Sequence, residues 1–393
     1  MLKQVGVPTQ KSVARASGVS RATVGAILAG GVVAARYSEE TRNRVTAAAE
    51  RLDYRPHRAA QVMRKRRSNL VAIVHFGGGI EAVRKTNLAL ARITNEKGYD
   101  YLSLDMNWYG GSVDRTLEEI VRLRAEGVLI SHTHEVFGEE HVAKLDRAGI
   151  PVVAVNGGRR RNLPQICDHA AGAFSGLVRH LIRSGHRRIL QLSPATAHLA
   201  SGLGRATDQR VVGFRRAIKA EGDWLSMDEG AFWSQWNQRT VLPERGVTGL
   251  TVHQDTRLYE RLEKPVYRFC RRLFAAGVLP DAIVCPNDFY AMEVIAAGLE
   301  CGVRVPGHLA VTGYDNDSIG EYPAFSLTTA EQDTDGICSA AMEMLVRRMT
   351  RMEPNGVRQE FDSRLIIRNS SGRAEPCSGP VRTRADLRKE HNL

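Results

Sequence analysis

Short apolar runs and amphipathic stretches alternate along most of this 393-residue chain, and this alternation constrains the fold more than any other feature. The run NLVAIVHF at 69–76 is continuous and apolar, as in a strand that is buried on both faces. Further strand candidates lie at 101–104, 127–131, 151–156, 188–193, 281–286, 309–315 and 364–368. Helical patterns lie between most of them, at 84–97, 114–124, 140–148, 170–184, 210–221, 289–301 and 334–350. This order predicts parallel α/β sheets in two sets, hence two lobes with a cleft at the carboxyl ends of their strands.

The first 56 residues have a different, all-helical pattern. Thr9 and Ser20 stand where helix N-caps belong, and the glycine in SGV at 17–19 suits a tight turn between two short helices. Ser38 begins a third amphipathic stretch. Two helices joined by a short glycine turn, with a third packed beneath them, describe a helix-turn-helix. We therefore predict a DNA-binding headpiece at 1–56, with a plain three-helix bundle as the alternative.

The second of these helices would read the DNA. We expect it from Arg21 to about Leu28, followed by a loop at 29–36. In a helix-turn-helix this helix enters the major groove with its N-terminus first. Arg21 can donate two parallel hydrogen bonds to guanine, and Ala22 can contact a thymine methyl group. In the alternative bundle, Arg21 is simply solvated.

The positive charge of the chain is concentrated towards its ends. The formal net charge is +12, and residues 1–67 hold 14 Lys and Arg against 4 acidic residues. Residues 68–371 hold 36 of each sign. A basic block in a segment that is expected to fold favours a polyanionic partner, chiefly nucleic acid.

The segment YRPHRAAQVMRKRR at 54–67 extends the basic block beyond the headpiece. Pro56 can open a helix here, but the apolar stretch is too short to be stable in water alone. Arg58 would hold a phosphate, and Met63 could be wedged between base steps, as in proteins that bend DNA from the minor groove. We predict a hinge helix or linker at 57–67 that folds on DNA.

Residues 9–67 resemble the DNA-binding headpiece and hinge of the lac repressor family (LacI/GalR). The shared pattern is VARASGVSRATV, followed by YSEETRNRVTAAAERLDYRPHRAAQVMR. The sequence departs from the family pattern in three places. The loop after the second helix is longer, His57 replaces the usual Asn, and Met63 replaces the usual Leu. These differences bear on which operator sequence is bound and on how strongly the hinge bends DNA. The resemblance implies phosphate contacts by Thr9 and Ser20, base-facing positions at Arg21, Ala22 and Gly25, and hinge positions at Arg58, Ala60 and Met63.

Residues 68–371 resemble the effector-binding core of the same family, through RSGHRRILQLS, DQRVVGFRRAI and PDAIVCPNDFYAMEVIAAGLECGVRVPGHLAVTGYDN. That core is similar to periplasmic sugar receptors, in which two lobes with Rossmann-like parallel sheets close on a small ligand. The resemblance implies that Arg210 donates to sugar oxygens and that Asp288 accepts from sugar hydroxyls. Arg210 could instead form a surface ion pair, and Asp288 could cap a helix. Further effector-binding candidates are Asn287, Asp315 and Gln332.

Two segments depart from this pattern. Residues 222–265 are longer than is usual in the family, and we expect an insertion there. Trp233 or Trp236 within it would stack on a sugar ring, or else anchor the insertion to its lobe. The tail at 372–393 is basic and lacks apolar periodicity, so we expect it to be disordered.

A dinucleotide-binding enzyme is the rival interpretation. The stretch VHFGGGIEA places Gly77, Gly79 and Ala82 as G-x-G-x-x-A after a strand, and Asp105 ends the next strand, as in an NAD-binding fold. The same glycines would also suit a mobile lip of the cleft, and no catalytic His, Asp or Lys constellation follows them. We therefore expect neither an enzyme nor a cofactor.

The remaining features indicate a soluble protein in a reducing compartment. The six cysteines form no CxxC pair and show no metal-ligand spacing, so we expect free thiols and no metal site. The N-terminus has no apolar core of an export signal, and no run of 18 apolar residues occurs. We expect a cytoplasmic protein with no membrane association.

These patterns together predict a transcriptional regulator, most often a repressor in such a family. It would bind double-stranded DNA as a homodimer at a near-palindromic operator, because a two-fold dimer presents two identical helices. A small effector that prefers one conformation of the core would change operator affinity. We expect a sugar as this effector, with a nucleobase or nucleoside as the alternative.

Overall fold

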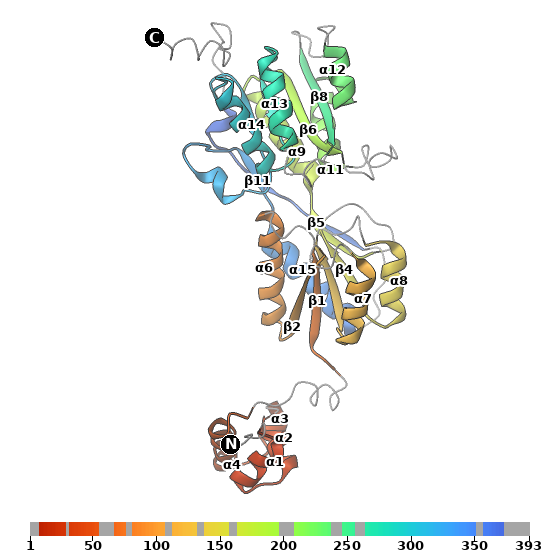
Figure 1. Cartoon of the computed structure of the whole chain (residues 1–393), viewed down its shortest axis with the longest axis vertical. Coiled ribbons are helices and arrows are strands. Elements are labelled where there is room, and N and C mark those ends of the chain that lie inside the picture. Colours follow the sequence, from red (N-terminus) through yellow and green to blue (C-terminus); the bar gives the residue numbers. More distant parts are fainter. Residues whose placement is uncertain are drawn as a thin grey trace, which may run out of the picture. The chain divides into compact units, whose positions relative to one another are not determined.

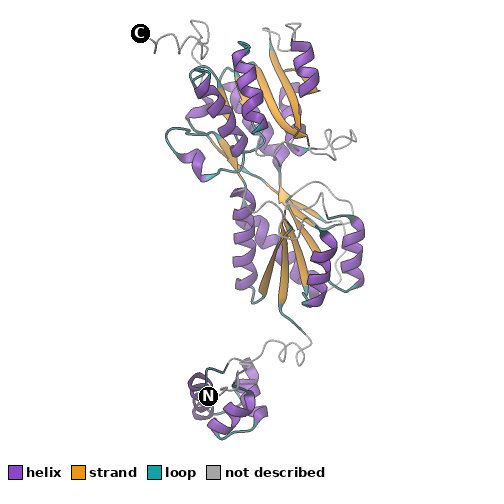
Figure 2. Ribbon diagram, in the orientation of Figure 1, coloured by secondary structure: helices purple, strands orange, loops and turns teal. Residues whose placement is uncertain are grey.

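The computed structural model describes residues 8–28, 31–54, 67–75, 81–106, 112–131, 137–156, 163–195, 208–236, 246–255, 264–350 and 357–372. The chain divides into two compact units, Met1–Asn69 and Leu70–Leu393, which are treated separately below. Figures 1 and 2 show an all-helical first unit and a second unit with helices packed on two sheets.

The first unit is built from short helices around a small apolar core. Their bounds are α1 Gln10–Ser17, α2 Arg21–Leu28, α3 Gly31–Ala34 and α4 Glu39–Arg51. The α3 turn lies within the segment at 29–36 that we predicted as a loop. The predicted stripes of α2 and α4 do form the core, which contains Val13, Ala14, Val24, Ile27, Val45, Ala48 and Ala49.

The local signals that define these helices act as predicted. The hydroxyls of Thr9, Ser20 and Ser38 accept hydrogen bonds from the backbone N–H groups of the first turns of α1, α2 and α4. Gly18 ends α1 with a φ of 68°, a left-handed conformation that favours glycine. The turn between α1 and α2 therefore depends on this residue.

The first lobe of the second unit surrounds a six-stranded parallel sheet in the order β12-β5-β4-β3-β1-β2. Its strands are β1 Leu70–His75, β2 Asp100–Asp105, β3 Gly127–Ser131, β4 Val152–Val155, β5 Gln165–Asp168 and β12 Arg358–Phe361. Its helices are α6 Glu81–Glu96, α7 Val113–Arg122, α8 Glu139–Arg147 and α15 Thr334–Thr350. One apolar cluster joins the sheet to α7 and α8, and another joins it to α6 and α15, so both faces are covered.

The second lobe repeats this plan around a five-stranded parallel sheet in the order β10-β9-β6-β8-β7. Its strands are β6 Arg188–Ala195, β7 Gly222–Asp228, β8 Val247–Asp255, β9 Ala282–Val284 and β10 Ala310–Thr312. Its helices are α9 Ala170–Arg183, α11 Gln209–Lys219, α12 Glu229–Trp236, α13 Pro265–Ala275 and α14 Asp288–Glu300. The pair α9 and α11 covers one face, while α12, α13 and α14 pack on the other. The prediction of two Rossmann-like parallel sheets is confirmed.

The chain crosses between the lobes three times. It passes from β5 to α9, from β11 (Thr329–Glu331) to α15, and from β12 to β13 (Arg364–Ile366). Strands β11 and β13 pair antiparallel, which fixes two of these crossings to each other. Two single 3₁₀ turns, η3 Ser318–Glu321 and η4 Asn369–Ser371, complete the described elements.

Residues 222–265, where we expect an insertion, supply two strands that were not among our strand candidates. These are β7 and β8. Strand β8 lies between β6 and β7, so this segment is part of the framework of the second lobe. Residues 373–393, which include most of the tail that we expected to be disordered, lie outside the described residues.

Candidate functional sites

The N-terminal end of α2 forms the exposed side of the helix-turn-helix. Ser20 caps the helix, and the next two residues, Arg21 and Ala22, are exposed. Gly25, which we expected on the same base-facing side, is buried, so the structure does not bring it to this surface. An exposed guanidinium and methyl group at a helix N-terminus can both reach base edges in a major groove.

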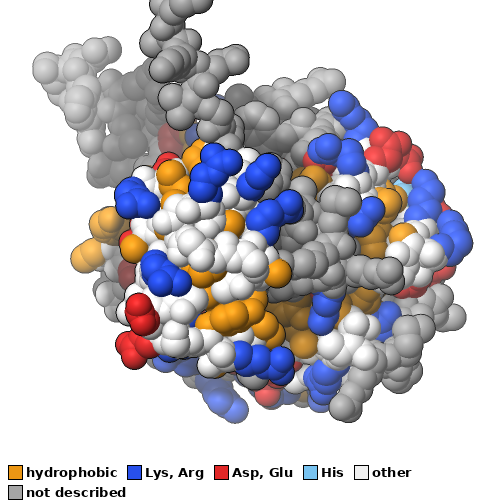
Figure 3. Space-filling model, turned by 90° about the horizontal axis from the view of Figure 1, so that it is seen from below, with side chains coloured by type: hydrophobic (Ala, Val, Ile, Leu, Met, Phe, Trp, Pro, Cys, Tyr) orange, Lys and Arg blue, Asp and Glu red, His pale blue; other side chains and the backbone are white. Residues whose placement is uncertain are grey.

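The first unit carries several exposed basic side chains. Figure 3 shows Lys and Arg side chains on the face that it draws. Among described residues, the exposed basic ones of the first unit are Lys11, Arg15, Arg21, Arg36, Arg44, Arg51 and Arg67. Such a surface attracts a phosphate backbone. The predicted hinge residues Arg58, Ala60 and Met63 lie outside the described residues.

A polar chain of hydrogen bonds links the two lobes where the chain crosses between them. Gln332, just after β11, donates to Asp315 at 2.6 Å and accepts from Asn156 at 3.0 Å. Asn156 follows β4 of the first lobe and accepts from the backbone N–H of Asp168 at 3.1 Å. The predicted residues Asp315 and Gln332 are therefore brought together. Asp315 follows β10 at the edge where ligands of parallel sheets bind, and Gln332 follows β11 in the crossing to α15.

Arg210 joins this cluster from the first turn of α11. Its guanidinium lies 5.5 Å from the ring centroid of Tyr314, and its Nε atom is buried without a partner among the described residues. Burial alone would lower the pKa of Arg210, but the carboxylates of Asp208, Asp315 and others raise it, so the side chain stays charged. A buried cation with an unused donor can bind a ligand oxygen.

Asp315 is the most unusual member of the cluster. Its φ is 103°, outside the region that non-glycine residues normally adopt. Burial raises its pKa to about 7, although Arg210 and Gln332 oppose this shift. Its carboxyl can therefore exchange a proton near neutral pH, and it is held in place by one donor, Gln332.

Asp288 is enclosed within the second lobe. Its side chain is fully buried, and its two oxygens accept from Asp317 N–H at 2.6 Å and from the Thr329 hydroxyl at 2.7 Å. It is not the N-cap of α14, because Asn287 takes that role by accepting from Tyr290 N–H. Burial raises the pKa of Asp288 to about 8. In this structure Asp288 supports the segment after β10, and its contact with a ligand stays a prediction.

Trp233 lies apart from this cluster, between α12 and α13. Its ring packs against Phe232 and Phe269, and the Arg272 guanidinium lies 3.9 Å from its centroid. Its indole N–H donates to Glu229 at 3.3 Å. The structure favours the anchoring role over sugar stacking for Trp233, and the side chain of Trp236 lies outside the described residues.

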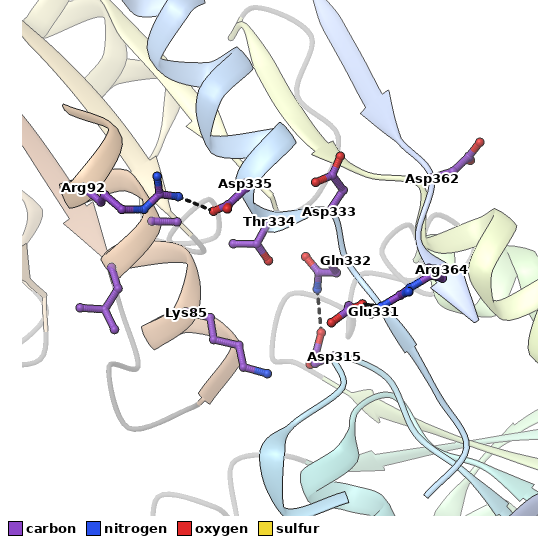
Figure 4. Close-up of a pocket in the computed structure, with 12 residues that line it drawn as sticks. Lys85, Arg92, Asp315, Glu331, Gln332, Asp333, Thr334, Asp335, Asp362 and Arg364 are labelled. Atoms are coloured by element: carbon purple, nitrogen blue, oxygen red, sulfur yellow. Dashed lines mark hydrogen bonds and ion pairs between the residues drawn. The ribbon is translucent and has the colours of Figure 1, made fainter. Parts of the chain in front are cut away.

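A pocket of about 790 Å³ opens beside Asp315 and Gln332, between α6 and the crossing strands. Figure 4 shows Lys85 of α6 directed towards Asp315, with two ion pairs at the margins: Arg92 with Asp335, and Glu331 with Arg364. The other lining residues are Leu88, Ala89, Asp333, Thr334 and Asp362. The lining holds five acidic and three basic side chains, and this excess of negative charge disfavours an anionic ligand.

Sequence reasoning missed three residues of the cluster. Asn156 ends the predicted strand 151–156, Asp168 ends β5, and Tyr314 directly precedes Asp315. The Tyr314 hydroxyl bonds to Asp168 and lies 3.1 Å from the Ser363 hydroxyl. Their position at the carboxyl ends of strands was a signal that could have identified them.

The structure describes part of the predicted dinucleotide-binding motif and most of the residues that could bind a metal ion. Gly77 and Gly79 lie outside them, while Ala82 is in α6 and Asp105 ends β2. Where the structure describes the chain, no group of three or more His, Cys, Asp or Glu side chains could hold a metal ion. The five described cysteines are free thiols, and burial raises the pKa of Cys167 and of Cys338 to about 12. No helix in these same ranges is long and apolar enough to span a bilayer.

Comparison with known proteins identifies both units. Residues 9–57 match the model of bacterial regulatory proteins of the lacI family, and residues 178–371 match a periplasmic binding protein-like domain. The HTH-type transcriptional repressor PurR of Shigella sonnei (strain Ss046) is 28% identical over 383 residues, covering 92% of this chain and 96% of PurR.

Solved structures show the same fold. The crystal structure of the lac repressor dimer bound to operator and the anti-inducer ONPF has a TM-score of 0.71 at 19% identity, covering 93% of this chain and all of that one. The complex of the transcriptional regulator CelR with cellobiose has a TM-score of 0.56 at 22% identity, covering 92% and 99% of the two chains. With its lacI-type headpiece and two-lobed periplasmic-binding-like core, the chain belongs to the LacI/GalR family of transcriptional regulators.

Proposed function

We propose that this protein is a repressor that binds a near-palindromic operator as a homodimer in the cytoplasm. Its affinity for the operator changes when a sugar binds in its core. The observation that carries the DNA-binding part is the exposed Arg21–Ala22 end of α2, capped by Ser20 and backed by a complete apolar core. A helix supported in this way can enter the major groove without rearranging.

The sugar assignment is supported by the cluster and pocket between the lobes. Arg210 and Gln332 offer donors, while Asp315 offers an acceptor, which is the mixture that hydroxyl groups need. CelR, which has the same fold, is seen in complex with cellobiose. The similarity to PurR is the reason why a nucleobase is retained as the alternative effector. The excess of acidic side chains in the pocket lining disfavours an anionic ligand, and its donors and acceptors suit a polyhydroxyl one.

The experiment has two arms. Full-length protein is first incubated with a pool of randomised DNA duplexes, and bound duplexes are recovered and sequenced. The proposal expects enrichment of a near-palindrome whose half-sites lie about one helical turn apart, as a two-fold dimer requires. Absence of any enriched sequence would overturn the DNA-reading role.

The second arm is a thermal-shift screen with separate sugar and nucleobase panels, because a ligand that binds only the folded state raises its apparent stability. A rise confined to sugars supports the proposal. A rise confined to nucleobases moves the effector to the alternative class without affecting the DNA-binding assignment.

A further inference from the structure

Residues 315–318 of the second lobe contact α6 of the first lobe, beside the crossing from β11 to α15. Lys85 of α6 donates from Nζ to the backbone carbonyl of Asn316 at 2.7 Å. Ser318 donates to the Glu81 carboxylate through both its backbone N–H and its hydroxyl, each at 3.2 Å. The same short loop thus begins in the polar cluster, at Asp315, and ends on α6.

The loop is held rigidly from inside its own lobe. Asp317 N–H donates to the buried Asp288, and Asn316 N–H donates to the Thr329 hydroxyl at 3.3 Å. Asp315 and Asn316 both have positive φ, at 103° and 49°, so the loop is strained as well as anchored. A loop with little freedom to bend will pass a displacement of Asp315 on to Asn316 and Ser318.

The contacts on α6 are ionic and shielded. Lys85 lies 3.5 Å from Glu81 and 3.9 Å from Asp317, and its side chain is about one third exposed. Burial alone would raise the pKa of Glu81, but the hydrogen bonds from Ser318 and the charge of Lys85 lower it. Glu81 is therefore an anion at neutral pH, and its hydrogen bonds to Ser318 are charge-assisted.

These contacts join the lobes through side chains rather than through the chain itself. The crossings β5–α9, β11–α15 and β12–β13 are covalent, so they stay intact when the lobes rotate. A hydrogen bond between the lobes can lengthen or break in such a rotation. The Lys85–Asn316 and Glu81–Ser318 contacts are hydrogen bonds of this kind.

We propose that residues 315–318 form a latch between the lobes, with Lys85 and Glu81 as its partners on α6, through which a change at Asp315 alters lobe opening. This inference rests on the proposed function in one respect, since it takes the polar cluster as the place where the effector binds. Lys85 and Glu81 are positioning residues here, because they act through the loop.

The test measures lobe separation in the absence of ligand and DNA. Donor and acceptor dyes are attached to cysteines placed at the exposed positions Glu118 of α7 and Ala275 of α13, in a background in which Cys301 and Cys377 are replaced. Single-molecule energy transfer then reports the distribution of distances between the lobes. K85M removes the donor to Asn316, and E81Q removes the charge that strengthens the hydrogen bonds from Ser318, both with little change in size.

The matched control is R92M, which removes another cation of α6. Arg92 pairs with Glu96 and Asp335, both in the first lobe, so this change leaves the latch intact. We expect K85M and E81Q to shift or broaden the distance distribution, while R92M matches the unsubstituted protein. Melting temperature, recorded for each variant, checks that all are folded. Unchanged distributions in folded K85M and E81Q would overturn the latch.

A double-mutant cycle tests the link to the polar cluster. D315N changes the charge beside Arg210 but keeps an oxygen that can accept from Gln332. We expect D315N to shift the distribution in the unsubstituted background and to have no further effect when K85M and E81Q are both present. An equal shift in both backgrounds, or none in either, would contradict transmission through the loop. Since neither operator nor effector is used, these outcomes are independent of the duplex selection and the ligand screen.

Discussion

Gln332 donates to Asp315 at 2.6 Å from the segment that connects β11 to α15, so a residue of a lobe crossing holds a carboxylate of the second lobe. The same Gln332 accepts from Asn156 of the first lobe. A ligand that takes over the bond to Asp315 must compete with Gln332, and the competition changes a contact that spans both lobes. Ligand recognition and lobe arrangement therefore share this side chain.

Asp315→Asn should weaken effector binding. If Asp315 accepts from ligand hydroxyls, loss of its charge removes a charge-assisted bond of about 1.5–3 kcal/mol, which corresponds to a roughly ten- to hundredfold lower affinity. Asp335→Asn is the control, because Asp335 lines the same pocket but pairs with Arg92 at its margin. Calorimetric titration with the sugar found in the thermal-shift screen measures both. Equal affinity of Asp315→Asn and the unsubstituted protein would remove Asp315 from the site.

Arg21→Ala should change which DNA sequences are bound. A bidentate contact to guanine is worth about 1–3 kcal/mol, and its loss should relax preference at one base pair in each half-site. Arg58→Ala, at the predicted phosphate contact of the hinge, should weaken all duplexes about equally. Binding to a library of single-base operator variants separates the two effects. A uniform loss for Arg21→Ala would mean that this residue does not read bases.

Gly18→Ala should destabilise the headpiece through backbone strain alone. The glycine has a φ of 68°, and a methyl group placed there would meet no atom within 4 Å. The left-handed conformation costs a non-glycine residue about 1–2 kcal/mol. Gly230→Ala in α12 is the control, since its added methyl also meets nothing but no positive φ is involved. Chemical unfolding of both variants is the measurement, and a Gly18→Ala loss no larger than that of Gly230→Ala would argue against the strained turn.

Asp288 should make the protein less stable as the pH rises from about 7 to about 8.5. Its pKa in the folded chain is about 8 against an ordinary value of 3.8, so the folded state keeps a proton that the unfolded state has lost. Stability from this proton is complete below the ordinary pKa and is lost as the pH rises through the folded value. The free energy of unfolding should fall by up to about 1.4 kcal/mol per pH unit for one such proton.

The chosen window avoids the titrations of the buried histidines and thiols, while Asp315, with a pKa of about 7, titrates near its lower end. His75, His180 and His186 have pKa values lowered by burial, which penalises the folded state only at acid pH, and the buried thiols act only above about pH 9. Asp288→Asn can still accept from Asp317 and should flatten part of the pH slope. Urea unfolding at several pH values measures it, and an unchanged slope in Asp288→Asn would assign the proton to another group, such as Asp315.

The sequence predicted the parts of this protein that depend on local patterns. The caps at Thr9, Ser20 and Ser38 and the run at 69–76 are set by neighbouring residues, and the structure contains them. Strands β7 and β8 were not predicted. Strand β7 is exposed at most positions and has no apolar run. The burial of Asp288 and the bond between Gln332 and Asp315 depend on contacts between distant segments, which spacing along the chain does not reveal.

The central claim is that ligand in the core controls the DNA affinity of the headpiece. The most direct measurement is the affinity of the full-length protein for its selected duplex, at fixed salt, with and without a saturating concentration of the sugar from the thermal-shift screen. The account predicts a change of about five- to a hundredfold or more, the usual range of allosteric coupling, and reciprocal change of sugar affinity by DNA. Identical operator affinity with and without bound sugar would contradict it.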